Sequence, residues 1–522
     1  MNEQTDIIND VFKKGVATTQ FKGEESMKKG QLFTTFAAAL LVVSSGLGMV
    51  SSVSAASKKA DVTTSASKAK YTPAKELKQK YDVIIVGAGG AGMSAALAAK
   101  QKGLNPVILE KMPTAGGNTL KASSGMNASE TKVEKKNGVK DTNKQFYEET
   151  LKGGHYKNDK ALLHYMVNNS ASAIDWLDSM GMKLDKLTIS GGMSVKRTHR
   201  PHDGSAVGTY LASGLLRNVK QQKIPLFVNA DVTKINEKDN KVSGVKVVMN
   251  QEKTKTVKAK AVIVTTGGYG ASKKMIKKYR PDLANYVSTN QKGSTGDGLK
   301  MITKLGGATT NLDQIQIHPT VYQKPPYLIG EATRGEGGIL VNKAGDRFTN
   351  DMGTRDKVSA AINKQDGKMA YVVFDAGVLK RSAVINQYIK KGFTKQGNTV
   401  AELAKQINVP ATELEKTMTT WNKSVTDHKD KFGRTTGMDH QLNQGPYYAI
   451  PIAPGIHYTM GGVKTNTKTQ VLKKSGKTIP GLYAAGEVVG GLHGYNRIGG
   501  NSVCAIIVFG RQAGNQAAAY LK

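Results

Sequence analysis

The sequence predicts an α/β fold built on a parallel sheet, and the clearest observation is one short segment near residue 85. Val83–Val86 is a β-branched apolar run of the kind found in a buried parallel strand. A GxGxxG turn follows it and leads into an alanine-rich stretch that we expect to be a helix. The glycines of this turn are Gly87, Gly89 and Gly92. A second apolar strand is expected at Val107–Leu109 and ends in Glu110. This order of strand, turn, helix and strand is typical of a Rossmann-like unit that binds a dinucleotide.

Each part of this segment has a physical role in holding a dinucleotide. The first two glycines allow a tight turn and let backbone N–H groups approach a pyrophosphate, while the third lets the helix lie close on its strand. Ala91 keeps the start of that helix slim. Glu110 lies about twenty residues beyond the glycines, where a carboxylate can accept a hydrogen bond from a ribose hydroxyl.

The length of the chain indicates how many domains it can form, and its net charge indicates which partners it can bind. At 522 residues the chain is long enough for two or three units. Its 75 Lys and Arg residues outnumber its 40 Asp and Glu residues and give a net charge of +35, which suits a polyanionic partner. The basic residues are spread along the chain without a nucleic-acid-binding motif, so we do not expect nucleic acid. Anionic cell-wall polymers are the partner that the charge favours.

The cysteine and histidine residues limit which redox cofactors the chain can bind. Cys504 is the single cysteine of the sequence, which excludes internal disulfides, Fe–S ligation and haem attachment through a CxxCH motif. His199 and His202 lack companions at metal-ligand spacing, and we expect no metal site. Any electron transfer is therefore expected to use a flavin.

Residues 1–55 have the layout of a leader followed by a signal peptide. A basic start at 27–29 precedes a segment with no further charge until Lys58, and this segment contains the apolar run FAAALLVV at 36–43. It closes in an A-x-A-like sequence that favours cleavage after Ala55, so we expect export to the cell surface or beyond. The alternative is an uncleaved anchor, because the uncharged run is long enough to span a membrane.

Residues 56–80 have the composition of a solvated linker, rich in Lys, Ala, Ser and Thr. Within it, DVTTSAS at 61–67 resembles the motif on which secreted flavin transferases attach FMN to the last hydroxyl, here Ser67. The resemblance implies covalent FMN on Ser67 and a flavin transferase as a partner. The alternative is a linker that matches the motif only through its composition.

Beyond the first unit, local patterns predict secondary structure in blocks. Residues 140–222 are expected to be mainly helical, with residues 208–219 the clearest helix. Residues 226–260 alternate as strands with one solvated face, and AVIVTTGG at 261–268 is expected to be a buried strand ending in glycines.

Several longer motifs occur in a fixed order after the first glycine turn. They are GGNTLKASSGMN (116–127), AVIVTTGG (261–268), STGDG (294–298), IQIHPT (315–320), GEATRGEGGILVN (330–342), GDRFTNDMGTRD (345–356), APGIHYTMGGV (453–463) and GLYAAGEVVGGLHGYNRIGGNSV (481–503). This series resembles the fumarate reductase and flavocytochrome c flavoprotein family, without its haem domain, over about residues 80 to 522.

The resemblance implies a Rossmann-like, two-part FAD-binding domain interrupted by an α+β substrate-clamp domain. The expected parts are residues 81–310 and 441–522 for the FAD-binding domain and residues 311–440 for the clamp domain. Bound FAD would be non-covalent. The glycine turn and the resemblance together assign FAD contacts to Gly87, Gly89, Ala91, Gly92, Glu110, Asn118, Thr119, Ser124, Gly125, Val232, Asp297, Tyr458, Glu487, Ser502 and Val503.

The resemblance also implies a reaction, the reduction of a C=C bond conjugated to a carboxylate. Such a reaction needs a hydride, a proton and cations that attract the carboxylate. Arg355 matches the family's proton donor, and Arg334 with Glu331 matches the relay that returns the proton. The residues that match substrate-binding positions are His318, His457, Arg497 and Gly500. The alternative for the arginines is a structural salt bridge, and for the histidines an ordinary core position.

Two departures from the family pattern bear on the substrate. Gly330 stands where a fumarate site would carry threonine, and Ser124 replaces a glycine beside the flavin loop. Fumarate is the expected substrate, and urocanate, acrylate or cinnamate is the alternative. The electron donor is expected to be a membrane or surface redox chain, since no second GxGxxG unit for NADH is present. Two other functions stay open: a flavin dehydrogenase that runs the opposite reaction, and a surface flavoprotein that only carries electrons.

Overall fold

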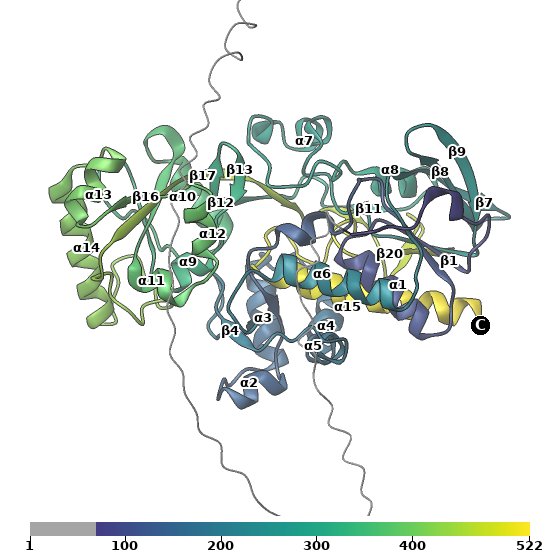
Figure 1. The fold of residues 1–522 in the computed structure, drawn as a ribbon, viewed down its shortest axis with the longest axis horizontal. Coiled ribbons are helices and arrows are strands. Elements are labelled where there is room, and N and C mark those ends of the chain that lie inside the picture. The colour runs from purple at the N-terminus through teal and green to yellow at the C-terminus, as the bar shows by residue number, and fades with distance from the viewer. Residues whose placement is uncertain (1–68) are drawn as a thin grey trace, which may run out of the picture. The chain divides into compact units, whose positions relative to one another are not determined.

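The structure is a computed structural model that describes residues 69–522 (Figure 1). The signal peptide, the cleavage site at Ala55 and the flavinylation motif at Ser67 lie outside the described residues, so these expectations stay predictions. Within residues 69–522, no helix has both the length and the apolar character that a membrane crossing requires.

A six-stranded sheet combines strands from the first half of the described chain with two strands from near its C-terminus. Its strands follow the order β19-β20-β10-β1-β2-β6, and all of them run parallel except the edge strand β19. Their bounds are β1 Val83–Val86, β2 Pro106–Leu109, β6 Leu226–Phe227, β10 Ala261–Val264, β19 Gln470–Leu472 and β20 Thr478–Ala484. Every residue of β1, β2 and β10 is buried, as expected for parallel strands covered on both faces. The strands predicted at 83–86, 107–109 and from 261 are therefore confirmed.

Three helices cover this sheet. They are α1 (Gly90–Gln101), α6 (Val207–Gln221) and α15 (Asn501–Leu521), and α1 packs against both of the others (Figure 1). Helix α15 approaches α1 very closely: a Cβ at Gly510 would lie 2.6 Å from the Ala91 carbonyl oxygen. The small residues of α1 and α15 therefore let the last helix of the chain rest directly on the first.

Residues 140–222, which were expected to be mainly helical, contain α3 (Asn143–Gly153), α4 (Lys160–Asn168), α5 (Ser170–Ser179) and α6, and the short helix α2 (Lys132–Lys136) precedes them. They also contain β4 (Lys186–Thr188) and β5 (Thr198–Arg200), and β5 pairs with both β4 and β3 (Met126–Asn127) in a small sheet that sequence patterns did not predict. Strands of two or three residues are too short to show the alternation of apolar and polar residues by which a strand is recognised in a sequence. Residues 226–260 do form strands, with β7 (Ala230–Lys238), β8 (Lys241–Met249) and β9 (Lys253–Lys258) in an antiparallel meander.

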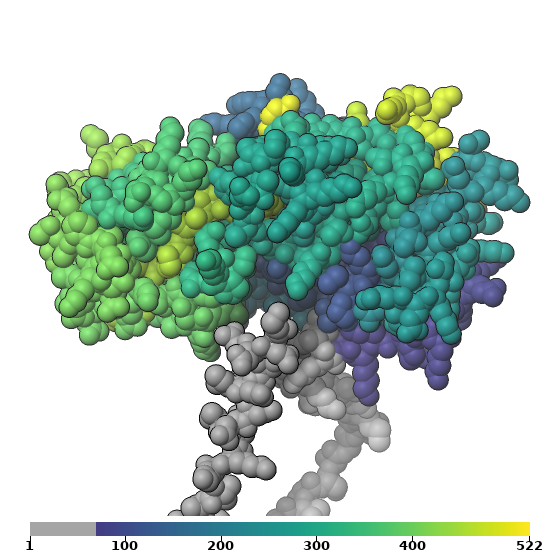
Figure 2. All heavy atoms as spheres, turned by 90° about the horizontal axis from the view of Figure 1, so that it is seen from above, coloured from purple at the N-terminus to yellow at the C-terminus, as the bar shows by residue number. Residues whose placement is uncertain are grey.

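A second, antiparallel sheet follows the order β13-β12-β17-β15-β14, and β16 also pairs with β17. Its strands are β12 Ile315–Gln323, β13 Pro326–Leu328, β14 Ile339–Val341, β15 Ala370–Asp375, β16 Lys395–Gly397 and β17 Tyr447–Thr459. Helices α9 (Ala332–Gly335), α10 (Arg355–Asn363), α11 (Ala376–Arg381), α12 (Ile385–Lys390), α13 (Val400–Ile407) and α14 (Ala411–Thr426) accompany it. In Figure 2 the yellow-green of residues near 450 lies between the green segments, in agreement with the pairing of β17 with both β12 and β15.

The remaining elements are short. They are α7 (Lys273–Tyr279), α8 (Asp297–Lys304), and β11 (Thr309–Thr310) paired with β18 (Gly462–Val463), with 3₁₀ turns at Ala74–Glu76, Gly117–Lys121, Pro281–Leu283 and Asp366–Lys368. A parallel sheet covered by helices, followed by an antiparallel sheet with its own helices, confirms the predicted fold class. The domain boundaries at 310 and 440 stay predictions.

Candidate active site

One cavity of about 610 Å³ runs between the parallel sheet and the second sheet. Its size falls within the usual range of ligand and cofactor sites. The predicted site residues that line it are Gly87, Gly89, Ala91, Glu110, Asn118, Thr119, Ser124, Val232, Asp297, Arg355, His457, Tyr458, Glu487, Arg497, Gly500, Ser502 and Val503. Gly92 and Gly125 do not line it. A Cβ at Gly92 would lie 2.0 Å from the Gly87 carbonyl oxygen, and one at Gly125 would lie 2.2 Å from that of His199, so both glycines serve backbone packing.

The glycine turn forms one end of the cavity, and Glu110 fixes its geometry. One Glu110 carboxylate oxygen accepts the Ala88 N–H at 2.7 Å, and the other accepts the Met112 N–H at 2.8 Å. Burial raises the pKa of Glu110, while these two hydrogen bonds lower it in part. The carboxylate therefore ties the turn after β1 to the end of β2, and its remaining lone pairs can accept from a ribose.

Next to this end, Asp297 forms an ion pair that sequence patterns did not predict. Lys111 Nζ lies 2.5 Å from Asp297 Oδ2, and the Thr295 hydroxyl donates to the same oxygen at 2.7 Å. Burial alone would raise the pKa of Asp297, but Lys111 and Thr295 together bring it below its usual value. Asp297 thus lines the cavity as a carboxylate.

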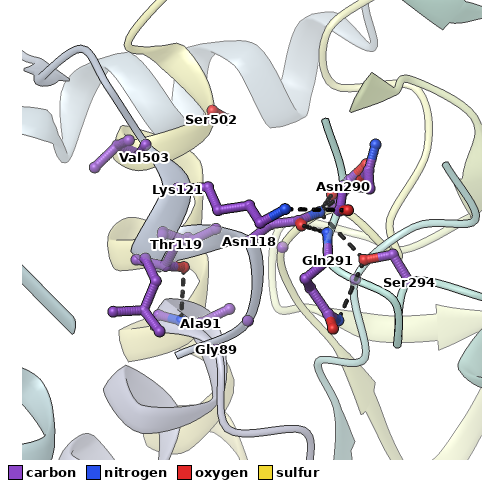
Figure 3. Close-up of a pocket in the computed structure, with 18 of the residues that line it drawn as sticks. Gly89, Ala91, Asn118, Thr119, Lys121, Asn290, Gln291, Ser294, Ser502 and Val503 are labelled. Atoms are coloured by element: carbon purple, nitrogen blue, oxygen red, sulfur yellow. Dashed lines mark hydrogen bonds between the residues drawn. The ribbon is translucent and has the colours of Figure 1, made fainter. Parts of the chain in front are cut away.

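Across the middle of the cavity, the 3₁₀ turn at 117–121 faces the loop before α8 (Figure 3). Thr119 Oγ1 accepts the Gly90 N–H at 3.0 Å beside the glycine turn. Asn118 and Lys121 point the other way: Asn118 Oδ1 accepts the Gln291 N–H at 2.8 Å, and Lys121 Nζ donates to the Asn290 carbonyl at 3.2 Å (Figure 3). Lys121, Asn290 and Gln291 were not predicted: Lys121 lies inside the motif at 116–127 without an assigned role, and no quoted motif contains Asn290 or Gln291.

The donors and acceptors around this cavity fit FAD. Gly89 faces open space, since a Cβ there would meet only Thr119 Oγ1 at 4.0 Å, so a pyrophosphate could approach the backbone. Ser502 and Val503 lie in the first turn of α15, a 21-residue helix whose N-terminus carries a partial positive charge. Glu487, whose pKa is raised by burial, accepts the Thr459 N–H at 3.0 Å and leaves its other oxygen near Asn118.

Arg355 occupies the first position of α10 and enters the cavity from the second sheet's side. Its Nε donates to Glu331 Oε1 at 2.7 Å, and its Nη1 donates to Gln316 Oε1 at 3.0 Å. Nη2 makes no hydrogen bond with a residue in the described range. Burial would raise the pKa of Glu331, but Arg355, Arg334 and Arg497 together lower it below its usual value. Glu331 is therefore a carboxylate that holds Arg355 with Nη2 free.

Arg334 and His318 lie behind Arg355 and do not line the cavity. Arg334 Nη1 donates to the Asp351 carbonyl oxygen, and its Nε has no partner within residues 69–522. His318 Nδ1 accepts the Thr320 N–H at 3.2 Å, so its proton is on Nε2, which lies 3.8 Å from Glu331 Oε1. Burial, followed by the charge of Arg355, keeps the pKa of His318 well below its usual value, so the ring is neutral.

His457 and Arg497 line the cavity beside Arg355. The ring of His457 packs 5.3 Å from that of His318, and its Nδ1 shares a 2.8 Å hydrogen bond with Thr289 Oγ1. The Arg497 guanidinium lies 4.6 Å from the Tyr458 ring centre and donates to the Ile498 carbonyl, and it forms no ion pair with a described carboxylate. Burial lowers the pKa of Arg497 to about 9, which still leaves it cationic at neutral pH. Two buried guanidinium groups thus face one cavity, and among the described residues only Arg355 is paired with a carboxylate, that of Glu331. The excess positive charge favours an anionic ligand.

These features define a class of protein, a flavin-dependent oxidoreductase with an anion site beside the cofactor cavity. The model of the FAD binding domain family matches residues 82–503. An NADH:fumarate oxidoreductase of Klebsiella pneumoniae is 48% identical over 84% of this chain and 48% of its own length. A urocanate reductase of Eggerthella lenta is 34% identical over 84% of this chain and 74% of its own. The solved open conformation of a flavocytochrome c3 fumarate reductase matches 86% of this chain and 80% of its own, with 42% identity and a TM-score of 0.71.

The chain belongs to the FAD-binding family of fumarate reductases and flavocytochromes c. The resemblance stated from the motifs is thereby confirmed, as is FAD as the cofactor of the domain. The chain spans about half the length of the Klebsiella relative.

Proposed function

We propose that this chain is an FAD-dependent reductase of the C=C bond of a small unsaturated carboxylate, with fumarate as the first candidate. The observation that carries the proposal is the position of Arg355. Two of its nitrogens are held by Glu331 and Gln316, and Nη2 remains for a ligand in the cavity that also contains Arg497 and His457.

In the proposed reaction, reduced FAD supplies the hydride when it is bound. Arg497 binds the carboxylate through its planar fork. Burial, followed by the charge of Arg355, keeps the pKa of His457 well below its usual value, so this ring is neutral and donates to the same group. Arg355 gives a proton from Nη2 to the carbon next to the carboxylate, because Glu331 and Gln316 orient the guanidinium toward the cavity. The neutral Arg355 left by this transfer regains its proton from solvent through the relay of Arg334 and Glu331: the Glu331 carboxylate takes up a proton and passes it to the guanidine of Arg355, and Glu331 is again a carboxylate at the end of the cycle. An arginine can act as an acid only if it is reprotonated at once, which this buried contact allows.

The test is oxidation of a chemically reduced dye by a panel of acids. Fumarate, urocanate, acrylate and cinnamate would be added in turn to the FAD-loaded protein with reduced methyl viologen. We expect fast oxidation with at least one acid and the highest kcat/KM with fumarate. A preference for urocanate would favour the second candidate, which the missing side chain at Gly330 supports. Oxidation with none of the acids would contradict the proposal and favour an electron carrier.

We propose from the sequence that the chain is exported, receives electrons from a membrane or surface redox chain, and carries FMN on Ser67. The support is the charge pattern of residues 27–58 and the motif at 61–67. The positive net charge would favour contact with anionic cell-wall polymers.

Intact-mass measurement tests processing and flavinylation together. In cells that contain a flavin transferase, we expect a mature chain that begins at Ala56 and carries the added mass of one FMN. A Ser67→Ala variant should keep the N-terminus and lose the added mass. An unflavinylated mature chain would contradict FMN at Ser67, and an unprocessed N-terminus would favour the anchor.

A further inference from the structure

Two hydroxyl groups from distant parts of the chain meet at Gly330. Tyr388 Oη, on α12, accepts the Gly330 N–H at 2.9 Å. A Cβ added at Gly330 would lie 2.9 Å from Ser123 Oγ and 3.4 Å from Tyr388 Oη. The two hydroxyls therefore surround the place that a side chain at position 330 would take.

Both hydroxyls border the cavity and keep a proton to donate. Ser123 and Tyr388 line the same cavity as Arg355, His457 and Arg497. Burial raises the pKa of Tyr388 to about 12, so its phenol stays protonated at neutral pH. Tyr388 Oη accepts from Gly330, but its own proton has no acceptor within residues 69–522, and Ser123 Oγ makes no hydrogen bond with a described residue. Each can thus donate one hydrogen bond to a ligand.

Arg200, in the short strand β5, fixes Ser123 from behind. Its Nη2 donates to the Ser123 carbonyl at 3.1 Å, its Nη1 to the Gly204 carbonyl at 3.2 Å, and its Nε to Thr188 Oγ1 at 3.2 Å. Arg200 is 1% exposed and forms no ion pair with a described carboxylate. A buried guanidinium without an anionic partner raises the local positive potential, which favours an anion next to Ser123.

We propose that Ser123 Oγ and Tyr388 Oη form the subsite for the second carboxylate of a dicarboxylate substrate. Arg200 is the positioning residue of this subsite. The inference rests on the proposed function, in which Arg355, Arg497 and His457 act on the other end of the substrate. The two hydroxyls then donate the hydrogen bonds to the second carboxylate that a threonine at position 330 would otherwise donate. Because a monocarboxylate has no group that accepts these hydrogen bonds, the subsite selects dicarboxylates.

Calorimetric titration of the oxidised, FAD-loaded protein with two saturated acids tests the subsite, and the flavin absorbance shows whether either acid reduces the FAD. Succinate has both carboxylates and propionate has one. We expect Ser123→Ala and Tyr388→Phe each to weaken succinate binding on the order of 10-fold to 100-fold, the contribution of a hydrogen bond to a charged group. Propionate binding should stay unchanged, because it does not reach the hydroxyls.

Tyr322→Phe is the matched control. The Tyr322 ring stacks on Phe393 at 4.2 Å near α12, and Tyr322 does not line the cavity. This variant should bind both ligands as the natural protein does. FAD content and the thermal unfolding midpoint would show that each variant is folded, and Ser123→Ala removes a single oxygen atom if Tyr388→Phe proves unstable.

A second pair of variants tests whether the two hydroxyls fill the space that a side chain at position 330 would need. Gly330→Thr alone should weaken succinate binding, because its Cβ would lie 2.9 Å from Ser123 Oγ. Adding Ser123→Ala to Gly330→Thr should restore part of the affinity, since the serine oxygen is gone and the threonine hydroxyl can replace it.

The results that would overturn the subsite are distinct from those that would overturn the function. Equal losses for succinate and propionate, or no loss for either, would show that the hydroxyls only support the fold. Tighter succinate binding by Gly330→Thr alone would also overturn the subsite. If the natural protein binds neither ligand and reduces no unsaturated acid, the proposed function fails, and the subsite fails with it.

Discussion

Replacing Arg355 with alanine should leave FAD bound and stop turnover. The residues that would hold FAD lie in the glycine turn, the 117–121 turn and α15, and none of them hydrogen-bonds to Arg355. The variant should therefore copurify with flavin, and dithionite should still bleach it. Reoxidation by fumarate should slow by about 10² to 10⁴-fold, the usual contribution of a positioned acid, and by more if Arg355 also stabilises developing charge. Stopped-flow reoxidation of the reduced protein measures the loss.

Two further variants separate proton transfer from charge. Arg355→Lys keeps a cation but lacks the planar fork that contacts Glu331 and Gln316 together, so it should not restore the rate fully. Arg280→Ala, which removes an arginine paired with Asp282 near the surface, should reoxidise normally. A near-normal rate for Arg355→Ala would contradict the proposed role, and loss of FAD would assign Arg355 to the fold.

The sequence predicted those parts of the molecule in which function depends on neighbours along the chain. The β1 strand, the glycine turn and Glu110 lie within about 30 residues, and their roles in the sheet follow from periodicity and turn chemistry. Arg355, His457 and Arg497 were found because each stands in a long motif, and the structure brings all three to one cavity.

Contacts between distant segments could not be predicted in the same way. Gln316 orients Arg355 from 39 residues away, and Tyr388 meets Gly330 across 58 residues. Ser123 reaches the same point from the FAD-binding side. Glutamine, tyrosine and serine are common at many kinds of position, so only the packing of the second sheet against the first reveals their place. Gly330 was interpreted from the sequence as a lost donor, whereas the structure surrounds it with two hydroxyls.

The second sheet depends on a buried charge cluster, and its removal should destabilise the fold strongly. Asp351 is fully buried and pairs with Arg347 at 2.5 Å and Arg434 at 3.2 Å. Its Oδ1 also accepts the N–H of Leu340 at 2.6 Å, in the middle of β14, which is an edge strand of this sheet. Both guanidinium groups lie against the Trp421 ring, at 4.6 and 4.4 Å from its centre. Without the Asp351 carboxylate, Arg347 keeps its ion pair with Asp430. Arg434 then remains a buried cation without an ion-pair partner among the described residues.

We expect Asp351→Ala to lower the free energy of unfolding by about 3 to 5 kcal/mol, the usual cost of breaking a buried ion pair from one side. Urea unfolding followed by the fluorescence of Trp421 and Trp176 measures the change. Asp366→Ala is the matched control, because Asp366 pairs with Lys343 at the surface, where solvent screens the charges, and its midpoint should not move. Since Arg334 donates to the Asp351 backbone carbonyl, the alanine variant should keep that contact at low urea concentration and retain measurable turnover. An unchanged urea midpoint for Asp351→Ala would show that Asp430 compensates both cations, and full loss of turnover in folded protein would show that the cluster orients Arg334 through the Asp351 side chain.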